Sequence, residues 1–162
     1  MKHVNPYALG VIVASIGLAM MLRIAAESPI LAAINPDWVL MFVLYWNMAA
    51  PSRVGIGFAW VTGLFMDVLT GRLLGQHALT YTIVAYLCIR LHRQLRNHTL
   101  LQQSLIILLL LLIDQLLIFW TQKIRQVDSI DWLYWAAPFT GALLWPMVFM
   151  VLRHVRRSFN VA

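Results

Sequence analysis

An apolar segment from Arg53 to Gly75, RVGIGFAWVTGLFMDVLTGRLLG, is the feature that most restricts how this chain can fold. Small residues recur in it every four positions and end at a carboxylate: Gly55, Ala59, Gly63 and Asp67. On a helix this spacing forms one slowly winding stripe along which a second backbone can approach closely, as in packed membrane helices. An ionisable group in hydrocarbon costs at least ~2.5 kcal/mol unless it faces protein, water or a charge. We therefore expect this helix to lie inside a helical bundle.

The composition excludes a soluble domain. Hydrophobic residues make up 62% of the 162 residues, charged residues make up only 11%, and the mean hydropathy is +0.79. So few charged side chains cannot cover so much apolar surface in water. We predict an all-α polytopic membrane protein that forms a single domain over residues 1–162. The lone Cys88 excludes an internal disulfide and is interpreted as a small core residue.

Six apolar segments are predicted to form transmembrane helices: residues 7–22, 37–50, 54–69, 76–92, 100–120 and 133–152. The first is interpreted as an uncleaved span, because Pro29 follows the only small residues suited to signal-peptide cleavage. The second and third rise only about 21 to 24 Å, against a hydrocarbon core of about 30 Å. They either cross a locally thinned bilayer or form a re-entrant hairpin, and Arg53 between them favours two complete crossings.

The fifth segment carries a sparse row of residues spaced for one helical face: Gln103, Ile107, Leu110, Asp114 and Thr121. We predict that this row faces the protein interior, because a carboxylate is costly in lipid. The leucines around it are typical of a lipid-facing surface and indicate no function. In the sixth segment Pro146 follows Trp145 and is predicted to kink the helix.

Basic residues are divided unevenly between the two predicted sides of the membrane. With a cytosolic amino terminus, eight face the cytosol: Lys2, Arg53, Arg90, Arg93, Arg96, Arg153, Arg156 and Arg157. Four face outward, together with four acidic residues: Arg23, Arg72, Lys123 and Arg125, with Glu27, Asp37, Asp128 and Asp131. By the positive-inside rule both termini are predicted to be cytosolic, and the net charge of +6 does not indicate nucleic-acid binding.

Three of these arginines, Arg90, Arg93 and Arg96, share one helical face. They are interpreted as an interfacial anchor for anionic lipid, with docking of a cytosolic protein as the alternative.

The sequence contains no motif for catalysis, nucleotide binding or metal binding. GxGxxG, P-loop, GxSxG and HExxH patterns are absent, and the five histidines show no ligand spacing. We therefore expect neither an enzyme nor a cofactor. Gly71 and Gly75 match GxxxG, but they bracket a loop and are interpreted as a turn.

Two alternatives remain for Asp67 and Asp114, which lie at similar predicted depths in the outer half of the membrane. They form a shared acidic site or proton path, or each has a structural role. In the structural alternative, each carboxylate hydrogen-bonds to a neighbouring helix or pairs with Arg23 or Arg72.

Two motifs carry a resemblance to a known family. The pair PDWVLMFVLYW and GLFMDVLTGRLLG, followed by LLWPMVFMVLRHVRR, resembles the MreD family of bacterial rod-shape-determining membrane proteins, and the similarity extends over most of the chain. The structural or partner candidates are Pro36, Trp38, Gly63, Asp67, Gly71, Gly75, Asp114, Trp145 and Pro146.

The resemblance implies a non-catalytic scaffold of the cell-elongation complex in the bacterial inner membrane. Its expected partners in peptidoglycan synthesis are MreC, RodA, the transpeptidase that works with RodA, and MreB filaments. The family's fold also resembles the membrane substrate-binding components of energy-coupling-factor vitamin transporters. The alternative function is therefore a component that binds or transports a small molecule or lipid in an intramembrane pocket near Asp67. The scaffold is favoured because the sequence offers few polar residues to line such a pocket.

Overall fold

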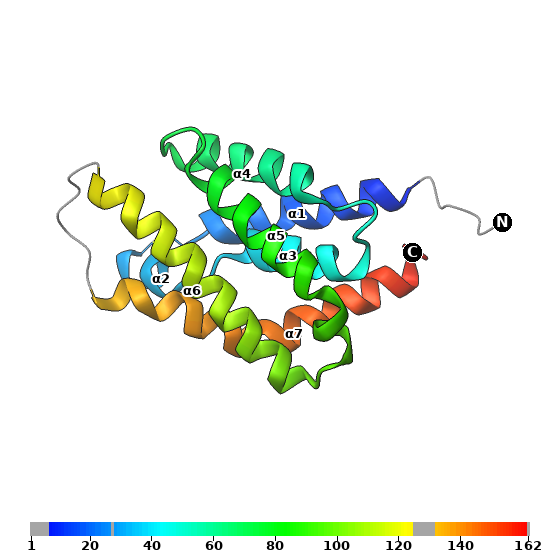
Figure 1. Ribbon diagram of the computed structural model, residues 1–162. Coiled ribbons are helices and arrows are strands. Elements are labelled where there is room, and N and C mark those ends of the chain that lie inside the picture. The colour runs from blue at the N-terminus through cyan, green and yellow to red at the C-terminus, as the bar shows by residue number, and fades with distance from the viewer. Residues whose placement is uncertain (1–6, 27, 125–131, 162) are drawn as a thin grey trace.

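A computed structural model describes residues 7–26, 28–124 and 132–161, and within these ranges every regular element is a helix. Six longer helices form the body: α1 (Ala8–Ile24), α3 (Trp38–Ala49), α4 (Ile56–Thr70), α5 (Gln76–Asn97), α6 (Leu100–Ile124) and α7 (Ala137–Ser158) (Figure 1). Each overlaps one of the six predicted segments, and the all-α prediction is confirmed. The sequence does not predict two short elements, α2 (Pro29–Ile34) and the 3-10 helix η1 (Trp132–Ala136), as separate helices.

The connection between α4 and α5 is a tight turn bounded by two glycines. Gly71 ends α4 with φ 62°, and Gly75 precedes α5 with φ 99°. Both values lie in the left-handed region, which side chains with a Cβ rarely adopt. The interpretation of Gly71 and Gly75 as turn residues is confirmed.

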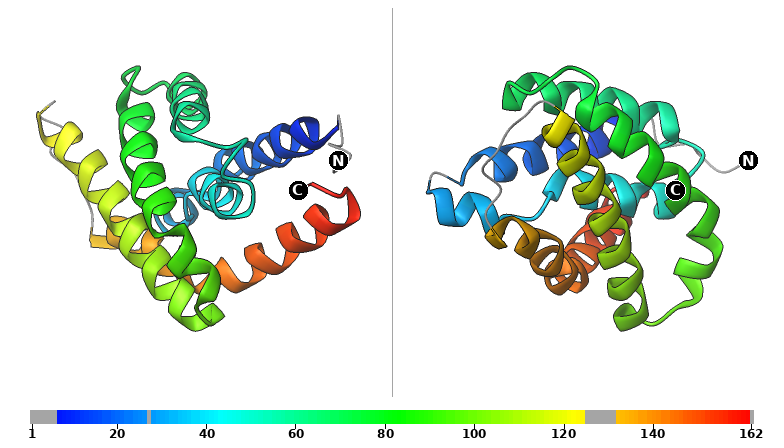
Figure 2. Two further views of the ribbon diagram at one scale, coloured as in Figure 1. Left: turned by 45° about the vertical axis from the view of Figure 1, so that its right-hand side comes forward. Right: turned by 60° about the vertical axis from the view of Figure 1, so that its left-hand side comes forward.

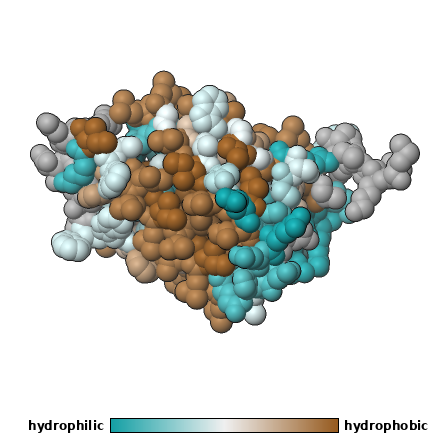
Figure 3. Space-filling model, viewed as in Figure 1, coloured by the Kyte–Doolittle hydropathy of each residue, from teal (hydrophilic) through white to brown (hydrophobic). Residues whose placement is uncertain are grey.

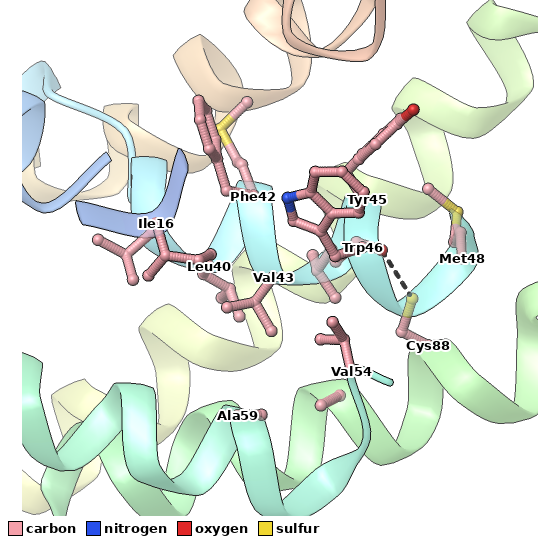
Figure 4. Packing of buried hydrophobic residues seen from close by; sticks show 14 of the residues in the cluster. Ile16, Leu40, Phe42, Val43, Tyr45, Trp46, Met48, Val54, Ala59 and Cys88 are labelled. Carbon is pink, nitrogen blue, oxygen red and sulfur yellow. Dashed lines mark hydrogen bonds between the residues drawn. The ribbon is translucent and has the colours of Figure 1, made fainter. Parts of the chain in front are cut away.

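The central helix of the fold is α3, although it is the shortest of the six (Figure 2). It packs against α1, α5 and α7, and every residue from Val39 to Met48 is buried. The indole of Trp46 donates from Nε1 to Oγ of Ser15 in α1 at 2.9 Å, so Trp46 packs against a neighbouring helix. The Cys88 thiol donates to the carbonyl of Leu44 at 3.7 Å (Figure 4), which confirms Cys88 as a core residue.

The prediction that the helix around Gly63 lies inside the bundle is wrong, because α4 is a peripheral helix. It packs mainly against α5, and its opposite face exposes large apolar side chains, with Phe65 61% and Val68 65% exposed. Gly55 precedes α4, and a Cβ added there would meet no atom within 4 Å. The packing stripe therefore begins at Ala59. Small residues let one partner approach closely, but they do not surround a helix with protein.

The outer surface of the molecule is strongly apolar, as expected for a membrane protein. Three segments are long and apolar enough to cross a membrane: Pro29–Ala49, Leu100–Ile124 and Trp132–Ser158. The helices α1 and α4 are apolar but shorter. Figure 3 shows a continuous hydrophobic face over α6, where Leu101, Leu105 and Leu109 are exposed. Such a surface in water would be a large unsatisfied apolar patch, whereas in lipid it is the ordinary state.

Candidate functional site

The carboxylate of Asp67 caps the first turn of α5 from the neighbouring helix. Its Oδ2 accepts from the backbone N–H of Gly75 at 2.8 Å, and its Oδ1 accepts from the N–H of His77 at 2.8 Å. A third contact, from the N–H of Ala78 to Oδ2, measures 3.4 Å. Gly75 has no side chain to cap its own helix, so Asp67 satisfies N–H groups that have no partner within α5. The negative charge also lies at the positive end of the α5 dipole.

The imidazole of His77 makes a further hydrogen-bond contact with Asp67. Its Nδ1 lies 2.8 Å from Oδ1 of Asp67, and both side chains are buried. Within the described residues Asp67 forms no ion pair with an arginine. Arg23 instead donates from Nη1 to the carbonyl of Asn35 at 3.0 Å. Of the partners considered for Asp67, the structure therefore shows hydrogen bonds to a neighbouring helix and no pair with an arginine among the described residues.

A close helix crossing brings these groups together. A Cβ added to Gly63 would lie 2.5 Å from Cα and 2.6 Å from N of Ala78, so only glycine fits at this crossing. Gly63 lies about one turn before Asp67 on the buried face of α4. The contact between α4 and α5 backbones therefore holds the N–H groups of α5 within reach of the carboxylate.

A second carboxylate, that of Asp37, ties α3 to α5 at the same end of the molecule. The hydroxyl of Tyr81 lies 2.8 Å from Oδ1 and 2.7 Å from Oδ2 of Asp37. Asp37 Oδ1 also accepts from the N–H of Leu40, which caps α3. Sequence reasoning missed this pair, because it treated Asp37 only as an outward charge. The available signal was the four-residue spacing of His77 and Tyr81, which places both on one face of α5 directly after the turn.

Asp114 lies close to these groups, and one of its two carboxylate oxygens is left without a partner in the described part of the chain. Its side chain is 2% exposed, and Oδ1 has no hydrogen-bond partner among the described residues. The predicted inward row on α6 is confirmed, since Gln103, Ile107, Leu110 and Asp114 are all buried. The last residue of the row, Thr121, is half-buried, and its hydroxyl accepts from Nε2 of Gln76 at 2.6 Å.

A cavity of about 110 Å³ lies at this end of the molecule and is lined by residues from several parts of the chain. Its charged and titratable lining residues are Arg23, Asp37, Arg72, His77, Asp114 and Tyr134. Asp67 does not line this cavity. The shared acidic site considered for Asp67 and Asp114 is therefore not the arrangement seen; Asp37 and Asp114 are the two acids that face the cavity.

The remaining candidates lie where α3 meets α7. Pro36 is buried, and a Cβ added to Gly141 of α7 would lie 3.3 Å from the Cβ of Pro36. Trp38 donates from Nε1 to Oδ1 of Asn35 at 2.7 Å. Trp145 is fully buried, and the residue after it, Pro146, lies inside α7. These positions are packing residues in the structure, and the described residues contain no cluster of three or more metal-ligating side chains.

Comparison with known proteins identifies sequence relatives. Residues 1–155 match the family described as rod shape-determining protein MreD. The rod shape-determining protein MreD of Haemophilus influenzae is 33% identical over 141 residues, which cover 87% of this chain and 87% of the relative. No solved structure matches the chain.

Proposed function

Since this chain belongs to the MreD family of rod shape-determining proteins, we propose that it is a non-catalytic membrane scaffold of the cell-elongation complex. In this role it links MreC to the peptidoglycan synthases, RodA and its partner transpeptidase, and acts with MreB filaments directly or through MreC. The family assigns the chain to the control of cell shape. The proposal adds how it does so, by holding partners together within the membrane.

The observation that carries this proposal is that Asp67 has a structural use. Asp67 is fully buried and is engaged by α5 N–H groups and by His77, so it is not available to a substrate. A carboxylate that caps a helix contributes to the stability of the fold. The polar cavity beside it, at about 110 Å³, is well below the ~300 Å³ at which pockets for small organic ligands begin. Both observations favour a scaffold over the alternative of a small-molecule binding or transport component.

We further propose that the six longer helices cross the inner membrane with both termini in the cytosol. Asp37, Arg72 and Asp114 line one cavity, which marks one end of the molecule, while α5 and α7 finish in arginines at the other end. This separation supports the predicted orientation. Lys2, Glu27, Arg125, Asp128 and Asp131 lie outside the described residues, as does the side chain of Arg96.

The orientation is tested with a cysteine at Ser52, in the exposed loop between α3 and α4, placed in a Cys88→Ser background. We expect labelling by membrane-impermeant reagents only from the cytosolic side. Labelling from the periplasmic side would contradict the two complete crossings or the orientation.

The scaffold is tested by purifying the protein from bacterial membranes in mild detergent and analysing both proteins and small molecules by mass spectrometry. We expect MreC in near-equal amount and no stoichiometric small molecule. A purified protein without MreC, but with a small molecule bound one to one, would contradict the scaffold and favour the binding component.

A further inference from the structure

A second cavity, of about 190 Å³, lies at the end of the molecule opposite the Asp37 cavity. It opens between the last turn of α3, the first turns of α6 and the last turns of α7. Its main lining residues are Tyr45, Met48, Gln103, Phe149, Arg153 and Arg156. None of the functions derived above uses this cavity.

The charge of this cavity is entirely positive. Arg153 and Arg156 line it, and the chain has no Asp or Glu in residues 38–66, 68–113 or 132–162. No side-chain carboxylate therefore pairs with these arginines at this end. Figure 3 shows hydrophilic surface gathered where α5 and α7 end, directly beside the hydrophobic face of α6. Guanidinium groups at the edge of an apolar surface are suited to a phosphate that is itself attached to apolar chains.

Gln103 adds an acceptor that lacks a donor. Its side chain is 5% exposed, and its Nε2 donates to the carbonyls of Leu95 at 2.8 Å and His98 at 3.3 Å. Those two bonds fix the orientation of the amide. Its Oε1 is buried and has no hydrogen-bond partner among the described residues. A buried acceptor of this kind is costly unless a hydroxyl or N–H group reaches it.

Tyr45 places a hydroxyl in the same cavity. The residue is buried at the end of α3, and in Figure 4 its hydroxyl points away from the packed core. It lies in the electrostatic field of Arg153, Arg156 and Arg157. The cavity thus combines two cations with a buried acceptor and a phenol hydroxyl, next to the apolar side chains of Met48 and Phe149.

We propose that this cavity binds the headgroup of an anionic phospholipid that carries free hydroxyls, as phosphatidylglycerol does. Arg153 and Arg156 bind the phosphate oxygens, and a headgroup hydroxyl donates to Oε1 of Gln103. The acyl chains leave the cavity beside its apolar lining residues, Met48 and Phe149. The same two cations without the Gln103 acceptor would bind any anion, so Gln103 supplies the selectivity for a hydroxylated headgroup.

The test measures apparent Kd values for phosphatidylglycerol and phosphatidylmethanol by native mass spectrometry of the detergent-purified full chain. The paired substitution Arg153→Gln and Arg156→Gln is expected to weaken phosphatidylglycerol binding about tenfold, because two charge-assisted contacts are lost. The comparison pair is Arg90→Gln with Arg93→Gln, two exposed arginines that do not line the cavity and that would attract any anionic lipid without selecting its headgroup. This pair is expected to weaken phosphatidylglycerol binding less than the cavity pair does, and to leave the preference between the two lipids unchanged. Gln103→Leu is expected to remove the preference for phosphatidylglycerol over phosphatidylmethanol, which has the same charge but no free hydroxyl, while leaving phosphatidylmethanol binding unchanged.

Each of four results would overturn the proposal. Equal weakening by the two arginine pairs would show general attraction to a basic surface. Competition by inorganic phosphate at the same concentration as lipid would assign the cavity to a soluble anion. Displacement of the lipid by an acidic peptide of equal charge would assign it to a protein segment. The double variant Arg153→Lys with Arg156→Lys keeps both charges, and the thermal midpoint of each variant shows whether it is folded. Lipid binding retained in the lysine variant supports the site. Complete loss of lipid binding in a folded lysine variant contradicts a mainly electrostatic site.

Discussion

The two short helices α3 and α4 are similarly apolar but have opposite surroundings. Both are strongly apolar, and neither spans the full hydrocarbon thickness as a helix. Yet α3 is buried on every side, while α4 buries one face and exposes the other. Length and hydropathy therefore do not indicate whether a membrane helix faces protein or lipid. What distinguishes the two helices is the number of neighbours that surround them: α1, α5 and α7 for α3, and mainly α5 for α4.

The two helices nevertheless share one device at the polar end of the molecule. Each carries an aspartate that is tied to α5, Asp37 through the hydroxyl of Tyr81 and Asp67 through the first N–H groups of α5. Helix α5 thus positions both short helices. The comparison predicts that the same substitution, made in α3 and in α4, lowers the stability of the fold by different amounts.

The largest difference is expected between Trp46→Ala in α3 and Trp60→Ala in α4. Trp46 is fully buried and donates to Oγ of Ser15, so its removal leaves a cavity and takes away that hydrogen bond, with a loss of about 3 kcal/mol or more. Trp60 is 49% exposed, and its removal should cost less than about 1 kcal/mol. Reversible unfolding of both variants in mixed detergent measures the difference. Equal losses would break the distinction between the two helices.

The next largest effect is expected within α4 itself, from Gly63→Leu. A leucine at Gly63 meets the backbone of Ala78, which cannot move aside, and the expected loss is about 3 kcal/mol with little folded protein recovered. Gly57→Leu is the matched control, because a Cβ at Gly57 meets no atom within 4 Å. Gel filtration after detergent extraction gives the folded fraction of each variant. Similar folded fractions would show that the α4–α5 crossing is not as close as the structure has it.

The smallest effects are expected at Asp67. Asp67→Leu removes the cap of α5 and should cost about 1 to 2 kcal/mol, together with part of the assembly with MreC. Asp67→Asn retains an acceptor for the α5 N–H groups and should largely preserve both folding and rod shape. Stability in detergent, co-purification of MreC and cell shape are measured for each variant. A folded Asp67→Asn protein that still binds MreC but gives round cells would point to a step that requires the charge.

Several features of the fold were predictable because their signals are local. Turn chemistry at Gly71 and Gly75, the spacing of the inward row on α6, and the approximate positions of the six apolar segments each depend on residues a few positions apart. The motifs around Trp38 and Asp67 likewise carry the family resemblance without any knowledge of the fold. For Asp67 the sequence predicted burial but left its partner open among several choices.

The sequence by itself determined that this is an all-helical membrane protein of the MreD family, with six apolar segments and a glycine-bounded turn after Asp67. Only the tertiary structure decided that α3 and not α4 is central, that His77 and the α5 N–H groups surround Asp67, and that Asp37 and Asp114 meet in one cavity. The physical reason is that lipid and protein interior are about equally apolar, so hydropathy cannot tell a helix enclosed by protein from one facing lipid. That distinction depends on close packing between segments far apart in the chain, which no local pattern records.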